Sequence, residues 1–310
     1  MGKAKRKLHL FKQYRENIEL LCENPYYKRD VLKDIVICPI CFHTFKESDV
    51  HKSGDKNYLT IEHVPPEHLG GKTEVLTCHK CNNFFSNADK ELNYIPDRPD
   101  SKVVNWRAKL KSEEGRFGAI TEFDFNKNEV KFTMSNKDDL MRFVDSVKDK
   151  KEFNFEVKDR TREVGANILK IAYLLAFHKF GYGLIMHPQY NFIRAQINNP
   201  YEEILDNHGV VHFSKDNTLP DGVFVVKQPK ELVSLLVRFK LTKQNGNTDS
   251  YSVHLPSPVD DAVEFYKRLN ELTAGAKYVV ANFNDLDYWH DRTQTFAAIQ
   301  ELDQYRLKRS

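Results

Sequence analysis

The feature that most constrains this chain is a pair of CxxC motifs in its N-terminal third. Cys38 and Cys41 form the first pair and Cys78 and Cys81 form the second, so residues 42–77 lie between the pairs. Two thiols separated by two residues can reach one metal ion, and two such pairs complete the tetrahedron that zinc prefers. We therefore predict a structural Zn²⁺ ion bound by these four thiolates, which contributes folding free energy to the segment around it.

The fifth cysteine and the lack of an apolar leader bear on the redox compartment. An odd number of cysteines argues against a disulfide framework, and Cys22, beside Leu20 and Leu21, is expected to pack in a helix. The sequence has neither a signal-peptide pattern nor an apolar run that could span a bilayer. We expect a cytoplasmic protein without a membrane partner. The alternative to the zinc site is that the four paired cysteines are buried thiols without a metal ion.

The segment between the two cysteine pairs carries side chains suited to hydrolysis. A strand over residues 59–64 is expected to hold Glu62 and His63 next to each other, and a second strand over 74–77 and a helix from Asn82 follow. A neutral histidine can accept a proton from water near neutral pH. Carboxylate and amide oxygens are the ligands that Mg²⁺ prefers. The segment therefore combines a base with ligands for a hard cation.

The order of these residues resembles the HNH, or ββα-metal, endonucleases, and in particular their branch with zinc knuckles. The resemblance covers residues 36–92 and is carried by the runs CPIC at 38–41, IEHVPP at 61–66 and LGGKTEVLTCHKCNN at 69–83. It implies an endonuclease that hydrolyses phosphodiester bonds, with nucleic acid, in the first place DNA, as its partner. It also implies Mg²⁺ or Mn²⁺ as a catalytic cofactor beside the structural Zn²⁺.

The resemblance also assigns roles to individual residues. His63 would be the general base and Glu62 the acidic metal ligand, while Asn82 and Asn87 would supply amide ligands from the helix. The middle asparagine of the family, which helps to hold the base, falls near Thr73, whose hydroxyl can still form a hydrogen bond. These residues also have structural interpretations. His63 could be a packed or surface histidine and Glu62 a solvated carboxylate at a strand end. Asn82 could cap the helix.

Other polar residues have weaker functional interpretations. Lys72 and Lys80 are candidates for contacts with backbone phosphates, with solvated side chains as the alternative. The Tyr-Trp-His run at 288–290 could stack on a base, but such aromatic clusters usually pack on their own domain. The six basic residues among the first fifteen can neutralise phosphates, although a solvated tail is the commoner case and the net charge of +3 is small.

The fold class expected from these patterns is α+β, in four parts. A basic N-terminal helix covers residues 1–30, the HNH module with its zinc knuckles covers 31–93, and a proline-bearing linker covers 94–103. An α+β domain over 104–310 is built around an apolar helix at 162–180. Its other expected elements are a hairpin at 117–134, strands at 209–213, 222–227, 232–241, 250–255 and 277–283, and helices at 259–272 and 285–308.

Two functions from different classes fit this sequence. The first is a metal-dependent HNH endonuclease, with a role in restriction or anti-phage defence implied by the resemblance. The domain at 104–310 would then confer specificity, form a homodimer, or hold the nuclease latent until a partner or ligand binds. The second is a non-catalytic zinc scaffold that binds nucleic acid or acts as an adaptor. The departure at Thr73 favours the scaffold, and the adjacent Glu62 and His63 favour the nuclease.

Overall fold

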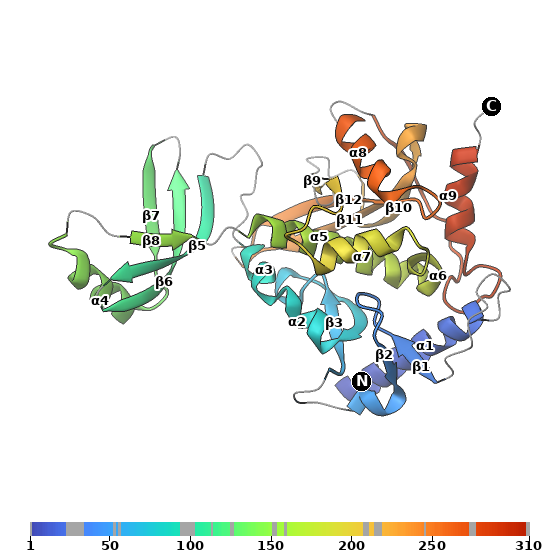
Figure 1. The fold of residues 1–310 in the computed structure, drawn as a ribbon, viewed down its shortest axis with the longest axis horizontal. Coiled ribbons are helices and arrows are strands. Elements are labelled where there is room, and N and C mark those ends of the chain that lie inside the picture. The colour runs from blue at the N-terminus through green and yellow to red at the C-terminus, as the bar shows by residue number, and fades with distance from the viewer. Residues whose placement is uncertain are drawn as a thin grey trace. The chain divides into compact units, whose positions relative to one another are not determined.

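The computed structural model confirms a mixed α+β fold whose described strand pairs are all antiparallel (Figure 1). It describes residues 2–22, 34–51, 54, 57–93, 103–112, 114–124, 127–150, 154–157, 160–206, 211–213, 219–244, 246–272 and 277–307. The chain divides into two compact units. Unit 1 joins Met1–Ser86 to Gly165–Ser310, and unit 2 is Asn87–Val164. No helix in the described ranges has both the length and the apolar character needed to cross a membrane.

This division differs from the expected one. The expected linker at 94–103 lies outside the described residues except for Val103, which begins strand β5 (Val103–Ser112). The N-terminal helix and the C-terminal half belong to the same unit as the cysteine pairs. The reason is tertiary packing: the core helix α5 (Thr161–Phe180) sends the Tyr173 hydroxyl to the Pro39 carbonyl oxygen at 2.6 Å.

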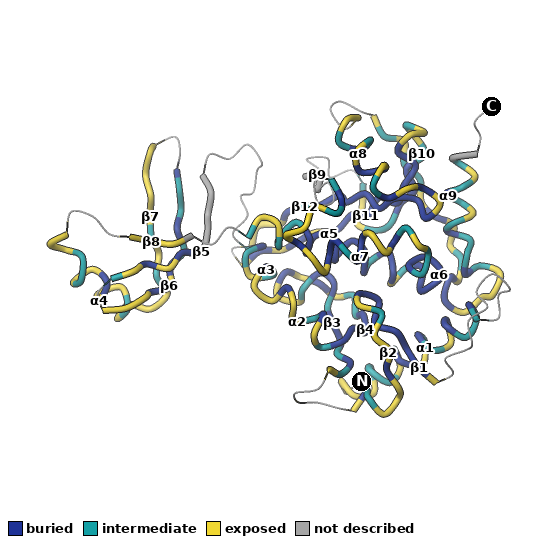
Figure 2. Tube along the Cα trace, in the orientation of Figure 1, coloured by how far each residue is buried: buried dark blue, intermediate teal, exposed yellow. Residues whose placement is uncertain are grey.

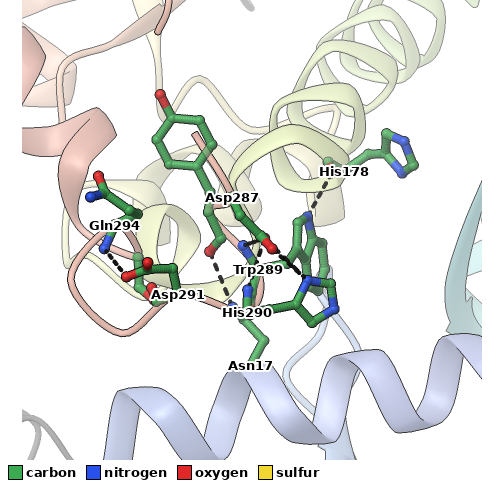
Figure 3. Close-up of polar contacts among 9 residues, drawn as sticks. Asn17, His178, Asp287, Trp289, His290, Asp291 and Gln294 are labelled. Atoms are coloured by element: carbon green, nitrogen blue, oxygen red, sulfur yellow. Dashed lines mark hydrogen bonds and ion pairs between the residues drawn. The ribbon is translucent and has the colours of Figure 1, made fainter. Parts of the chain in front are cut away.

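The N-terminal helix α1 (Lys3–Cys22) is an integral part of unit 1. Its buried face includes Phe11, Tyr14 and Leu21. The Asn17 side chain donates a hydrogen bond from Nδ2 to the Trp289 carbonyl oxygen at 2.8 Å and accepts one at Oδ1 from the backbone N–H of Tyr182, also at 2.8 Å. Figure 3 shows Asn17 reaching from α1 to the segment around Trp289. The aromatic residues at 288–289 are buried and pack on their own domain.

The segment around the cysteine pairs contains two short antiparallel ribbons. Strand β1 (Ile35–Ile37) pairs with β2 (Thr44–Lys46), and β3 (Leu59–Val64) pairs with β4 (Thr73–Cys78). The 3-10 turns η2 (Glu47–His51) and η3 (Glu67–Leu69) lie before and after β3. Helix α2 (His79–Phe84) follows β4 directly, and α3 (Ser86–Glu91) follows α2. The helix therefore begins three residues before the expected Asn82, since Cys78 caps its start.

The C-terminal part of unit 1 contains a five-stranded sheet in the order β13-β10-β11-β12-β9. The strands are β9 (Val211–Phe213), β10 (Gly222–Gln228), β11 (Ser234–Thr242), β12 (Thr248–Pro256) and β13 (Val279–Asn282), close to the five expected ranges. Strands β11 and β12 are buried along most of their length (Figure 2). The other helices are α6 (Tyr182–Ile185), α7 (Tyr190–Asn198), α8 (Ala262–Leu272) and α9 (Ala297–Leu307). Helix α7 was not expected, and α9 begins later than residue 285.

Unit 2 is built on a four-stranded sheet in the order β7-β6-β5-β8. Strand β6 (Gly115–Asp124) and β7 (Glu129–Thr133) form the expected hairpin, β8 spans Asn154–Val157, and α4 spans Lys137–Val147. The core of this unit includes the buried residues Leu110, Phe117, Ala119 and Phe143. The long strand β5 lies where no strand was expected.

Candidate functional site

The four paired cysteines converge in unit 1. Their sulfur atoms all lie within 4.8 Å of one another, and Cys41 Sγ is 3.7 Å from Cys78 Sγ. A tetrahedral zinc ion with Zn–S bonds of about 2.3 Å places its sulfurs about 3.8 Å apart. The cluster therefore has the dimensions of a tetrathiolate zinc site. Four thiolates around one ion leave no position for water, so this site is structural.

Backbone groups and burial support metal binding by these thiols. The backbone N–H of Cys78 donates to Cys38 Sγ at 3.4 Å, and that of Cys81 donates to Cys78 Sγ at 3.4 Å. Burial raises the pKa of the Cys38 thiol, whereas the hydrogen bond from the Cys38 thiol lowers the pKa of Cys78. Neighbouring thiols in one buried cluster cannot all ionise without a cation, and zinc supplies the charge that stabilises four thiolates.

His63 is partly exposed and lies between two carboxylates. Its side chain is 28% exposed, so water can reach the imidazole. Its Nε2 lies 3.6 Å from Glu74 Oε1, and its Nδ1 lies 3.8 Å from Glu67 Oε2. Glu74 is directly opposite His63 in the β3–β4 ribbon and also pairs with Arg6 of α1. A carboxylate on one side of the ring can hold the imidazole in a fixed orientation.

The residue beside His63 is therefore Glu74 and not the expected Thr73. Thr73 is opposite Val64 in the ribbon, and side chains alternate between the two faces of a strand. Thr73 consequently points to the other face from His63. The sequence analysis missed both Glu74 and Arg6. Only a hairpin register centred between His68 and Leu69 pairs residue 74 with residue 63, and nothing local to the ribbon indicates Arg6.

Glu62 lies on the opposite face of the ribbon in a buried ion pair. Lys170 of α5 places its ammonium nitrogen 2.5 Å from Glu62 Oε1, and the Thr77 hydroxyl donates to Glu62 Oε2 at 2.8 Å. The Lys170 side chain is only 3% exposed and that of Glu62 9%. Both carboxylate oxygens are thus engaged, and the charge that a bound cation would balance is already balanced by Lys170.

Asn82 connects helix α2 to strand β3. Its Nδ2 donates to Thr60 Oγ1 at 3.0 Å and to the Ile61 carbonyl oxygen at 3.3 Å. The helix cap is Cys78, whose sulfur accepts from the backbone N–H of Cys81, so the interpretation of Asn82 as a cap is wrong. Asn87 is exposed on α3 and belongs to unit 2, so it is not placed relative to His63.

The described contacts do not by themselves identify a site for a catalytic cation. Within the described ranges, the four cysteines are the only group of three or more His, Cys, Asp or Glu side chains close enough to share an ion. Glu62 and His63 occupy opposite faces of β3, and no contact joins either of them to Asn82 among the described residues. The cysteine cluster is consistent with zinc, whereas Mg²⁺ or Mn²⁺ at Glu62 and Asn82 stays a prediction.

No protein-family model matches this chain, and neither a curated protein nor a solved structure is significantly similar to it. The geometry of the site is therefore the basis for a functional proposal.

Proposed function

We propose that this chain is an HNH-type endonuclease that hydrolyses phosphodiester bonds of nucleic acid, with His63 as the general base. The observation that carries the proposal is the partly exposed His63 imidazole between Glu67 and Glu74. Strand β3, strand β4 and helix α2 follow one another in the ββα order of that family, next to a zinc-sized cysteine cluster. DNA is the substrate that the resemblance implies.

The proposed chemistry uses the side chains on the His63 face of the ribbon. The imidazole accepts a proton from water while the water oxygen bonds to phosphorus, and the nearby Glu74 carboxylate stabilises the imidazolium that forms. The P–O bond to the leaving sugar oxygen breaks, and that oxygen takes up a proton from solvent. Arg6 pairs with Glu74 and keeps that carboxylate in place. Proton removal by a positioned histidine contributes about 10²- to 10⁴-fold to a hydrolysis rate.

The catalytic cation implied by the resemblance has no assigned step in this proposal. Lys170 already balances the charge of the Glu62 carboxylate, and Asn82 is engaged with strand β3. Unit 2 and the segment Gly165–Ser310 would serve target choice, self-association or control by a partner or ligand. Restriction or anti-phage defence is the biological setting that we propose for such a nuclease.

A nicking assay on supercoiled plasmid tests the proposal. Full-length protein is incubated with plasmid in the presence of Mg²⁺ or Mn²⁺, and wild type is compared with His63→Ala. The matched control is His68→Ala, since His68 is an exposed histidine five residues further along the chain. We expect His63→Ala to cleave about 10²- to 10⁴-fold more slowly and the control to cleave normally. Equal cleavage by wild type and His63→Ala would exclude His63 as the base.

A second candidate is a non-catalytic zinc scaffold that binds nucleic acid. It is favoured by the Glu62–Lys170 pair, because a buried ammonium occupies the carboxylate that a nuclease of this type would use for its cation. Nucleic-acid binding without cleavage, in Mg²⁺ and in Mn²⁺, would support the scaffold over the nuclease.

A further inference from the structure

A hollow of about 600 Å³ opens beside the cysteine cluster in unit 1. We name it the knuckle pocket. Its lining includes Phe42, Phe84 and Phe85 together with Asn57, Lys80 and Asn198. Pockets that bind small molecules have volumes of about 300–1,000 Å³ and combine apolar walls with a few polar groups. Among the described residues that line it there is no aspartate or glutamate, and the knuckle pocket is suited to a flat, neutral group.

Two aromatic rings in the knuckle pocket are available for stacking. Phe84 ends helix α2 with 51% of its surface exposed, whereas the adjacent Phe85 is buried. Phe42 has a φ of 58°, which bulky residues rarely adopt. Its ring lies 3.7 Å from the guanidinium carbon of Arg194, which holds the ring in place. The knuckle pocket thus presents one fixed ring and one exposed ring.

Polar groups at the rim match the edge of a base and a phosphate. Asn57 Oδ1 accepts from the backbone N–H of Lys80 at 3.3 Å, and Asn198 Nδ2 donates to the Arg194 carbonyl oxygen at 2.8 Å. Within the described ranges, the Asn57 amide nitrogen and the Asn198 amide oxygen have no protein partner, which leaves one donor and one acceptor. The exposed Lys80 ammonium forms no ion pair with a described residue.

We infer that the knuckle pocket binds an unpaired nucleobase of a nucleic-acid strand, with the adjoining phosphate at Lys80. The inference rests on nucleic acid as the partner in the proposed function. Bases stack on aromatic side chains and bond through their edges to amides, and cationic side chains follow the backbone. Cys41 and Cys81 also line the pocket. The negative charge of a tetrathiolate zinc there repels a phosphate, so the neutral base enters and the phosphate stays at the rim.

A second stacking surface adjoins the knuckle pocket in sequence. Tyr58 follows Asn57 and His79 precedes Lys80, and their rings stack with centroids 4.6 Å apart and an interplanar angle of 23°. The ammonium of Lys7 lies 6.0 Å from the centre of the Tyr58 ring. Aromatic rings interleaved with cationic side chains are typical of surfaces that bind single strands without sequence preference. Tyr58, His79 and Lys7 therefore provide a further surface for the bases and phosphates of the same strand.

Fluorescence anisotropy with a labelled single-stranded DNA oligonucleotide tests the inference. The zinc-loaded full-length protein is titrated without Mg²⁺ or Mn²⁺, so that binding is measured apart from cleavage. We expect Phe84→Ala to weaken binding about 5- to 100-fold through lost stacking. We expect Lys80→Gln to reduce the slope of log affinity against log salt by about 0.7, the contribution of one phosphate contact in a single strand. A blunt duplex should bind more weakly than the single strand.

The matched control is Phe192→Ala, which removes an exposed phenylalanine of α7 that does not line the knuckle pocket. Zinc content and circular dichroism of all variants must match the wild type. Wild-type affinity in Phe84→Ala, or an equal loss in Phe192→Ala, would overturn the inference. Weakened binding by Phe84→Ala in a protein that never cleaves would support the pocket and contradict the nuclease. If cleavage depends on His63 while Phe84→Ala binds normally, the nuclease is supported and the pocket is contradicted.

Discussion

The two faces of the β3–β4 ribbon differ in how their charged groups are satisfied. On one face Glu62 is buried with Lys170 and Thr77. On the other face the partly exposed His63 lies beside Glu74, which Arg6 holds from α1. Adjacent residues of a strand point in opposite directions, and the contacts of Glu62 and His63 differ accordingly. We call the surroundings of the buried Glu62 the closed face and those of the partly exposed His63 the open face, and we propose that the first serves stability and the second chemistry.

The energetic contrast between the faces follows from burial. Removing one partner of a buried ion pair costs about 3–5 kcal/mol, because the remaining charge is left unpaired away from water. A partly exposed pair such as Arg6–Glu74 contributes about 0–1 kcal/mol. Substitutions on the Glu62 face should therefore change the free energy of unfolding, and substitutions on the His63 face should change the rate of cleavage.

The largest effect is expected from loss of zinc, which anchors the end of the ribbon that carries both faces. Structural zinc sites contribute about 10–16 kcal/mol of apparent binding free energy, as much as a whole domain's stability. We expect Cys78→Ser to bind no zinc and to lose the cooperative thermal unfolding of unit 1. Cys22→Ser, which removes the one cysteine outside the cluster, should keep one zinc ion per chain and the wild-type transition. Metal analysis measures the zinc content and calorimetry the unfolding transition. An unchanged transition in zinc-free protein would refute the zinc assignment.

The next effect concerns the closed face alone. We expect Lys170→Met to reduce the free energy of unfolding by about 3–5 kcal/mol, since it leaves the buried Glu62 carboxylate without its counter-charge. The double variant Glu62→Gln with Lys170→Met should recover much of that loss, because neither charge remains. Urea denaturation of the two variants and the wild type measures the differences in free energy of unfolding. Wild-type stability in Lys170→Met would show that the pair does not close this face.

The smallest effect on stability is expected on the open face. Arg6→Gln and Glu74→Gln should each change the free energy of unfolding by less than about 1 kcal/mol, because Arg6 is 39% exposed and Glu74 20% exposed. Glu74→Gln should nevertheless slow plasmid nicking, by less than His63→Ala does, because the imidazole loses the carboxylate that orients it. Denaturation and nicking rates are measured on the same preparations. A Glu74→Gln protein that is strongly destabilised would make this face structural as well.

Local sequence patterns predicted most of the elements around the site. The CxxC spacing predicted the four-cysteine cluster, because the two residues between the cysteines of a pair let both sulfurs reach one ion. The sequence predicted the strands β3 and β4, and their register then decides that Glu74 rather than Thr73 faces His63. The register depends on where the turn closes, so the strand pattern alone did not indicate Glu74.

The remaining features depend on contacts between distant parts of the chain. Lys170 reaches Glu62 from a helix that follows the whole of unit 2, and no pattern near residue 62 indicates this partner. For the same reason the sequence placed a domain boundary at 94–103, although Gly165–Ser310 returns to the unit that holds the cysteines. Arg6 likewise meets Glu74 only because α1 packs against the ribbon.

The most direct test of the contrast between the faces is the nicking rate of one variant from each face. Full-length His63→Ala and the double variant Glu62→Gln with Lys170→Met are compared with wild type in the same Mg²⁺ or Mn²⁺ buffer, after zinc content and folding have been matched. We predict a fall of about 10²- to 10⁴-fold for His63→Ala and a wild-type rate for the double variant. A folded double variant that cleaves as slowly as His63→Ala would place Glu62 in the catalytic site and contradict the division of the ribbon into a structural and a chemical face.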